Sequence, residues 1–165
     1  MSKIASRLIA EVAACHARLI EVIERLNDAD FRAVAGPTAP SILFHVWHVA
    51  RWNDLDQARL SDGPQRWIAE GLGPAWGLGD IALGDDDSGT GMRSDGVARL
   101  APSAPDLIAY ATGAFAAFES ALGTLPPDSP AFMDAALTAL VHDNRHLGMI
   151  EALIGAAGRA GSATN

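Results

Sequence analysis

The sequence has very little cysteine and lysine, and each shortage excludes a class of protein. Its single cysteine, Cys15, rules out an internal disulfide framework and an all-cysteine zinc site. Its single lysine and its net charge of -8 argue against a nucleic-acid or anionic-membrane binder. No apolar run approaches the roughly 18 residues of a membrane span, and Glu11 interrupts the region where a signal peptide would have its apolar core. We therefore expect a soluble, cytoplasmic protein without nucleic-acid or membrane partners.

The chain is also poor in β-branched residues and rich in alanine, a bias that favours helices over strands. Its 165 residues suffice for one domain with its own hydrophobic core. We expect an all-α fold with a single domain over residues 1–158 and a flexible tail over residues 159–165.

Apolar spacing and turn residues predict four long helices. They run from about Ser2 to Leu26, from near Pro40 to Leu60, from Ser103 to Leu122, and from Ser129 to Gly155 or Gly158. The third and fourth helices are joined by a short link, so we expect that pair to be antiparallel. The pattern predicts a four-helix bundle with a long crossover between helices 2 and 3, for which an up-down-down-up order is allowed.

The crossover, residues 62–103, holds nine of the sixteen glycines, yet it is too long for a structureless loop in a compact domain. We expect it to pack back on the bundle through its large apolar side chains, which are Trp67, Ile68, Leu72, Trp76 and Leu78. Its acidic run, Asp85 to Asp87, is interpreted as a solvated turn, because a calcium site would need more ligands at regular spacing.

Histidine pairs on two of the predicted helices are the main chemical signal. His142 and His146 lie one helical turn apart, which suits two ligands of one metal ion. They belong to a stripe that should face the core, at positions 135, 139, 142, 146, 149 and 153. Buried imidazoles need partners, and one metal ion would serve both. The sequence therefore predicts a metal site in the bundle core.

The second helix contributes His45 and His48, which lie in an almost continuous apolar run. Their spacing turns them about 60° apart around the helix, so we expect only one of them to face the axis. Spacing alone leaves open which one binds metal. His16, beside Cys15, is expected to be a partly exposed polar residue. Trp47, Trp52, Phe115 and Phe118 are expected in the core.

Two rival metal chemistries fit the sequence poorly. A carboxylate-bridged di-iron bundle needs Glu-x-x-His on two helices, and no glutamate here has a histidine three residues later. The run from His142 to His146 resembles the zincin motif His-Glu-x-x-His with aspartate in place of the base, but no third-ligand motif follows it. Neither a di-iron enzyme nor a metallopeptidase is expected.

The residues resemble the DinB-like, or YfiT-like, four-helix metalloproteins. The similarity lies in the segment from Ser41 to Ala50, in His142 to Gly155 with Gly148 after the second histidine, and in the crossover from Trp67 to Gly91. By position, the resemblance implies that His48, His142 and His146 are the metal ligands and that His45 packs beside them. It also implies an up-down-down-up topology and a homodimer. Arg145 and Met149 depart from the family pattern, which often has an aromatic residue and a glutamine at these positions.

Three histidines leave a metal ion with an open position, which is typical of catalytic sites. Zinc is the expected metal, with nickel or iron as alternatives. The resemblance implies a thiol S-transferase that uses a low-molecular-weight thiol of the mycothiol or bacillithiol type, with an electrophile under the loop of Trp67 and Trp76. In that role Asp143 or Arg145 would steer the substrate, whereas each is otherwise a surface charge of the helix. The alternatives are a hydrolase of a small ester, amide or lactone, and a non-catalytic, stress-associated metal-binding protein.

Overall fold

The computed structural model describes residues 2–127 and 129–158, and every regular element in that part of the chain is a helix. The four long helices are α1 (Lys3–Ile23), α3 (Ile42–Ser61), α7 (Ala104–Thr124) and α8 (Pro130–Ala156). The short helices α2 (Asp28–Phe31), α4 (Arg66–Ala69), α5 (Leu72–Ala75) and α6 (Ser94–Arg99) lie in the connections. The expected all-α class is confirmed, and the expected tail lies outside the described residues.

Each long helix begins after a serine whose hydroxyl oxygen accepts a backbone N–H three residues further on. Ser2 accepts from Ala5, Ser41 from Phe44, Ser103 from Asp106 and Ser129 from Phe132, at 3.1 to 3.3 Å. These contacts satisfy donors that a helix start leaves unpaired. Because Ser41 is the cap, α3 begins at Ile42 and not near Pro40. The first helix also ends earlier than predicted, at Ile23.

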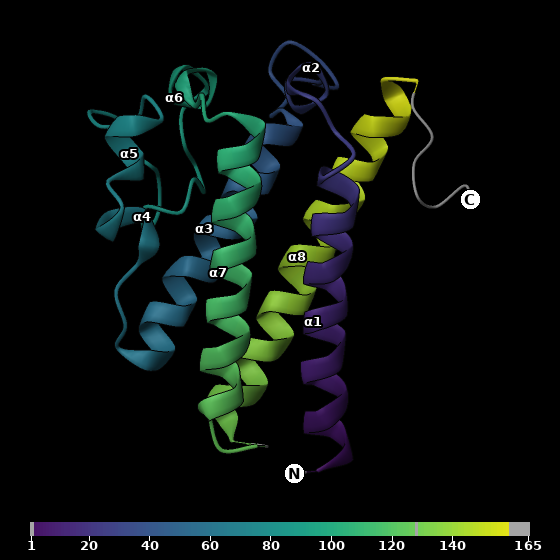
Figure 1. The fold of residues 1–165 in the computed structure, drawn as a ribbon, viewed down its shortest axis with the longest axis vertical. Helices are drawn as coiled ribbons and strands as arrows, with labels where there is room; N and C mark the ends of the chain where they lie inside the picture. The colour runs from purple at the N-terminus through teal and green to yellow at the C-terminus, as the bar shows by residue number, and fades with distance from the viewer. Residues whose placement is uncertain (1, 128, 159–165) are drawn as a thin grey trace.

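The four long helices pack side by side along most of their length (Figure 1). In this view α1 rises from the N-terminus, α3 and α7 descend, and α8 rises again. α3 packs against α7 and α8, and α1 packs against the same two helices. Their inward faces form a core that includes Leu19, Trp47, Leu107 and Ile150, all at most 2% exposed.

The segment between α3 and α7 lies beside these two helices (Figure 1). Trp67, Trp76 and Leu78 are buried as predicted, but the prediction was wrong for Ile68, which is 68% exposed. The Trp67 ring contacts the rings of Trp47 and Trp76, each with centroids 5.6 Å apart. Large apolar side chains of the crossover are therefore part of the hydrophobic core.

Asp54 of α3 forms hydrogen bonds with the first turn of α4, near the start of this crossover. It is fully buried, and its carboxylate accepts the backbone N–H groups of Arg66 and Trp67 at 2.8 Å. It also accepts the Tyr110 hydroxyl of α7 at 3.0 Å. One side chain thus holds α4 against both α3 and α7.

Further along the crossover, the acidic run is an exposed turn, as the sequence predicted. Asp86 and Asp87 adopt positive φ angles of 54° and 56°, and the turn is closed by an isolated bridge between Asp85 and Thr90. Ser88, within this turn, approaches α3, and its carbonyl oxygen lies 2.7 Å from Nδ1 of His48.

No helix within the described residues is both long enough and apolar enough to cross a membrane.

Candidate metal centre

Three histidines from two helices gather between α3 and α8. One ring nitrogen each of His48, His142 and His146 lies within 4.8 Å of the others. The ring centroids are 5.1 Å apart for His48 and His142, 4.8 Å for His48 and His146, and 4.6 Å for His142 and His146. The structure therefore brings together the three residues that the family resemblance implied.

The hydrogen bonds of two of these rings fix which nitrogen faces the cluster. The Nδ1 of His48 lies 2.7 Å from the carbonyl oxygen of Ser88, and the Nδ1 of His142 lies 2.8 Å from Oδ1 of Asp143. Both oxygens are acceptors, so each Nδ1 carries the proton and donates. Each Nε2 is then left with a lone pair, and the two Nε2 atoms face each other at 3.2 Å.

This facing pair fits a bound cation. Two neutral imidazole nitrogens cannot hydrogen bond to each other when neither carries a proton. Two nitrogens bound tetrahedrally to zinc at about 2.0–2.1 Å would be about 3.3 Å apart. The observed 3.2 Å separation is close to that value. A divalent ion would satisfy both lone pairs at once.

Burial keeps the rings of His48 and His146 neutral at pH 7, and the neutral imidazole is the form that binds metal. Burial lowers the pKa of His48 to about 4, although the hydrogen bond to Ser88 opposes this shift. Burial also lowers the pKa of His146 to about 3, with further lowering from the neighbouring His142, His48 and His45. The pKa of His45 is lowered by burial as well.

His45 lies one turn before His48 and contacts a different ring. Its Nδ1 is 3.0 Å from Nδ1 of His146, and the side chain is buried. His45 is not in the three-nitrogen cluster. It is placed to orient His146 from outside the cluster.

Asp143 differs from the sequence prediction. It was expected as a surface charge, but it is only 1% exposed. Its Oδ2 accepts from the Asn53 amide at 3.0 Å and lies 3.1 Å from Nε2 of His16. Burial alone would raise its pKa, but the hydrogen bonds from His142, His16 and Asn53 outweigh burial, so the pKa is lowered. Asp143 is therefore an ionised carboxylate that orients the His142 ring so that its Nε2 faces the cluster.

His16 was also predicted wrongly as a partly exposed residue, since it is 2% exposed. Its Nε2 faces Asp143, and its Nδ1 lies 2.7 Å from Oε1 of Glu119 on α7. Both of its nitrogens must donate, which requires the protonated ring. Burial would lower its pKa, yet the hydrogen bonds to Asp143 and Glu119 raise it above the ordinary value. The ring also stacks on Phe115 with centroids 4.3 Å apart.

The neighbouring Cys15 is no part of the cluster. Burial, followed by the charge of Asp143, raises the pKa of its thiol to about 12. The group is thus a protonated thiol, which is a poor metal ligand.

Aromatic rings flank the cluster on α3. Phe44 stacks on His48 with centroids 5.6 Å apart and an angle of 10°. Trp52, expected in the core, is half-buried and contacts the His142 ring at 5.7 Å. The expectation of an electrophile under Trp67 and Trp76 was wrong, because these rings pack into the core.

The cluster opens to solvent beside His142. A shallow groove of about 360 Å³ is lined by Leu137, Thr138, Val141, His142 and the exposed Arg145. A smaller cavity of about 60 Å³ lies next to His142, between Trp52 and Asp56 on α3 and Thr138 on α8. Burial raises the pKa of Asp56 despite its contact with Arg59. Sequence reasoning missed Asp56, because one carboxylate on a helix carries no motif.

The fold and the cluster define an all-helical protein with three converging histidines. The sequence profile of the DinB superfamily matches residues 11–150, and the chain belongs to that superfamily. A solved structure of a conserved protein from Enterococcus faecalis resembles it with a TM-score of 0.71 and 17% identity, over 94% of this chain and 99% of the other. That likeness concerns the fold alone. A comparison with curated proteins finds no match.

Proposed function

We propose that the chain is a metal-dependent enzyme whose divalent ion is held by His48, His142 and His146. The facing Nε2 atoms of His48 and His142 carry this proposal, because each ring already donates through its other nitrogen. Three neutral imidazoles add no negative charge and leave an open position, as in catalytic sites. Zinc is the ion that we propose first, with nickel and iron as alternatives.

The reaction that we propose is transfer of a low-molecular-weight thiol, of the mycothiol or bacillithiol type, to an electrophile. An ion in such a site acidifies a bound thiol or water. The chain would orient the thiol in the groove beside His142. Arg145 lines that groove, and the buried indole N–H of Trp52 has no hydrogen-bond partner among the described residues. The Arg145 guanidinium is a donor for polar atoms of a substrate in the groove, whereas Trp52 lines the smaller cavity next to His142.

Asp56 favours a second candidate, hydrolysis of a small ester, amide or lactone. It lines the cavity next to His142, and its raised pKa brings the carboxylate nearer to the range of a general base. In this role it would accept a proton from an attacking water.

The wider assignment is part of the same proposal. We assign residues 1–158 to one DinB-type four-helix bundle, with the crossover between its second and third long helices. We also propose a homodimer. Leu137 and Val141 on α8, which line the groove, are 47% and 62% exposed, and this apolar surface supports a contact with a second copy along the groove.

Elemental analysis tests the metal site directly. Protein purified without a chelating tag should contain about one equivalent of metal, and a His48/His142/His146 triple-alanine variant should contain none. Equal metal content in both proteins would contradict the ligand assignment.

Single variants of α3 separate the two histidines on that helix. His48→Gln should lose most of the metal, whereas His45→Gln should retain it, because His45 reaches only His146. The opposite order would move the ligand to the earlier turn.

A thiol panel with a generic electrophile separates the two reactions. Turnover that requires added thiol supports transfer. Turnover with water alone, inhibited by thiols and reduced by Asp56→Asn, supports hydrolysis. A metal-loaded protein without either activity would be a non-catalytic metal-binding protein.

A further inference from the structure

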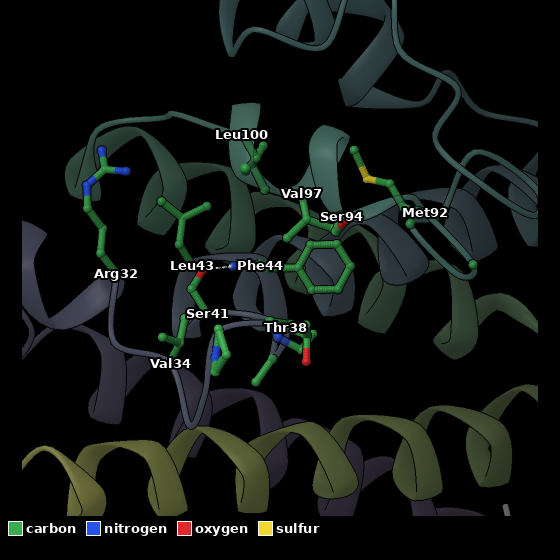
Figure 2. Close-up of a pocket in the computed structure, with 16 residues that line it drawn as sticks. Arg32, Val34, Thr38, Ser41, Leu43, Phe44, Met92, Ser94, Val97 and Leu100 are labelled. Carbon is green, nitrogen blue, oxygen red and sulfur yellow. Dashed lines mark hydrogen bonds between the residues drawn. The ribbon is translucent and has the colours of Figure 1, made fainter.

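A second cavity, distinct from the groove beside His142, lies at the beginning of α3. It has a volume of about 480 Å³ and is bounded by the α2–α3 loop, the first turn of α3 and the segment around α6. Figure 2 shows the Phe44 ring facing Val97 and Ser94, with Arg32 at one end of the cavity and Met92 at the other. This volume is in the range of small-molecule sites, which is about 300–1,000 Å³.

The described residues that line this cavity are mainly apolar, and none of them carries a carboxylate. Its inner wall is formed by Leu43, Phe44 and Leu100, which are buried. The protein has 20 acidic and 12 basic residues in all. A lining with one arginine and no acid is therefore positively charged although the protein as a whole is negatively charged. An apolar body with a negative end would match this lining.

Arg32 has no acidic partner among the described residues. Eight of the ten arginines in the described part of the chain lie within 4 Å of a carboxylate. Within that part, the two exceptions are Arg32, which lines this cavity, and Arg145, which lines the groove beside His142. The two guanidinium groups left available for an external anion thus lie at the two cavities.

The wall between this cavity and the metal centre is thin. Phe44 lines the cavity and stacks on His48 with centroids 5.6 Å apart. Gly89 lines it too, and a Cβ on Gly89 would be 3.1 Å from Nδ1 of His48. A molecule in the cavity would therefore lie next to a metal ligand without touching the ion.

We propose that this cavity binds an organic monoanion with an apolar body, such as a medium-chain carboxylate, with its charged end at Arg32. The apolar body would lie on Leu43, Phe44 and Leu100. Apolar burial would supply most of the affinity, because an exposed ion pair contributes little. The proposal goes beyond the proposed function, because this cavity is separate from the groove beside His142 and shares no lining residue with it, and binding itself needs no metal.

Calorimetric titration with straight-chain carboxylates from butanoate to decanoate tests the proposal. Affinity should rise about fourfold for each added methylene until the cavity is filled. Alkylammonium ions of equal length should bind more weakly than the carboxylates. No saturable binding, or equal binding of both ions, would overturn the proposal.

Two arginine variants locate the charged end. Arg32→Gln should weaken carboxylate binding by about two- to fivefold and leave the binding of an alcohol of equal length unchanged. Arg145→Gln is the matched control, because it removes the other unpaired arginine, and it should have no effect. An effect of Arg145→Gln equal to that of Arg32→Gln would refute the assignment to this cavity.

A third variant fills the cavity from its rim. Ala98 is an exposed lining residue on α6, so Ala98→Trp should abolish binding without disturbing the core, which thermal melting by circular dichroism checks. Retained binding in a folded Ala98→Trp protein would overturn the proposal.

The same titrations on metal-stripped protein separate this proposal from the metal centre. Unchanged carboxylate binding after chelation would support the cavity even if the chain proved to hold no metal. Binding that disappears with the metal would place the carboxylate on the ion and refute the cavity.

Discussion

The Asp143 carboxylate connects His142 of the histidine cluster with the protonated His16 ring of α1. Its Oδ1 accepts a hydrogen bond from Nδ1 of His142, and its Oδ2 accepts hydrogen bonds from the Asn53 amide and from Nε2 of His16. A carboxylate behind a metal-binding histidine fixes the ring and raises its basicity. His16 supplies the positive charge that keeps this carboxylate ionised although it is buried.

Replacing Asp143 by asparagine should weaken metal binding by about 10- to 100-fold, because the amide is uncharged and cannot accept from all three donors. Competition with a chromophoric chelator measures the affinity. Asp134→Asn is the matched control, an exposed acid on the same helix, and should leave the affinity unchanged. Equal affinities for the two variants would mean that Asp143 does not act on His142.

The protonated state of His16 predicts a specific dependence of stability on pH. Its pKa is raised above the ordinary value of 6.5, so folding favours the protonated ring. The stabilisation is complete below about pH 6.5 and is lost as the pH rises through the folded-state pKa.

The free energy of unfolding in urea should therefore differ most between wild type and His16→Gln at pH 6, and the difference should shrink at higher pH. Metal-stripped protein isolates this effect. A difference that stays constant from pH 6 to pH 9 would show that folding does not raise the pKa of His16.

Among the elements, the long helices were predictable from the sequence and the short ones were not. Serine caps and apolar spacing mark α1, α3, α7 and α8, whereas α2, α4, α5 and α6 are four to six residues long and too short for a periodic signal. The crossover tryptophans were foreseen as packing residues. The role of Asp54 was not foreseen, because its three donors, on Arg66, Trp67 and Tyr110, lie 12 or more residues away in the sequence.

The buried face of α8 is rotated around the helix axis relative to the stripe that the sequence predicted. Met149, expected to face inward, is 41% exposed. The buried positions of α8 centre on Asp143 instead, and His142 and His146 lie at the edge of the buried face. An aspartate at the centre of a helix core face is unexpected unless its partners are known, and these partners are on α1 and α3. The three ligands could be proposed from their motifs, but the groups that orient them could not.

A substitution of Asp54 tests whether its hydrogen bonds hold the crossover against α3 and α7. Asp54→Asn should lower the free energy of unfolding by about 3 kcal/mol or more, because the variant leaves the buried Arg51 without its acid. Urea unfolding measures the loss. Asp80→Asn, which breaks the exposed pair with Arg99, should cost little. A small loss for Asp54→Asn would mean that the crossover does not depend on this carboxylate.

At the scale of the whole molecule, the histidine cluster joins three parts of the fold. α3 and α8 carry the histidines, and the crossover reaches them through the Ser88 carbonyl. A ligand that binds only the folded state stabilises it, by about 4 kcal/mol at a thousand times its dissociation constant. Metal binding should therefore stabilise the bundle and the docked crossover together.

Adding zinc to metal-stripped protein should raise the melting temperature and slow amide hydrogen exchange from Ser88 to Thr90. The triple-alanine variant should respond in neither measurement. A higher melting temperature with unchanged exchange in this segment would separate the crossover from the metal centre.

The contact between the crossover and His48 is made by a backbone carbonyl, and this has a consequence for sequence divergence. This hydrogen bond does not itself depend on a side chain, although Ser88 is fully buried and its hydroxyl donates to the Asp85 carbonyl at 2.7 Å. The exposed residues of the turn can therefore change over evolution without altering the contact with His48. The neighbouring position is not free in this way. Gly89 has a φ of 91°, and a Cβ there would be 2.5 Å from the Trp47 ring. Among relatives with this site, we expect glycine to persist at position 89 while the exposed residues of the turn, Asp85 to Asp87, vary.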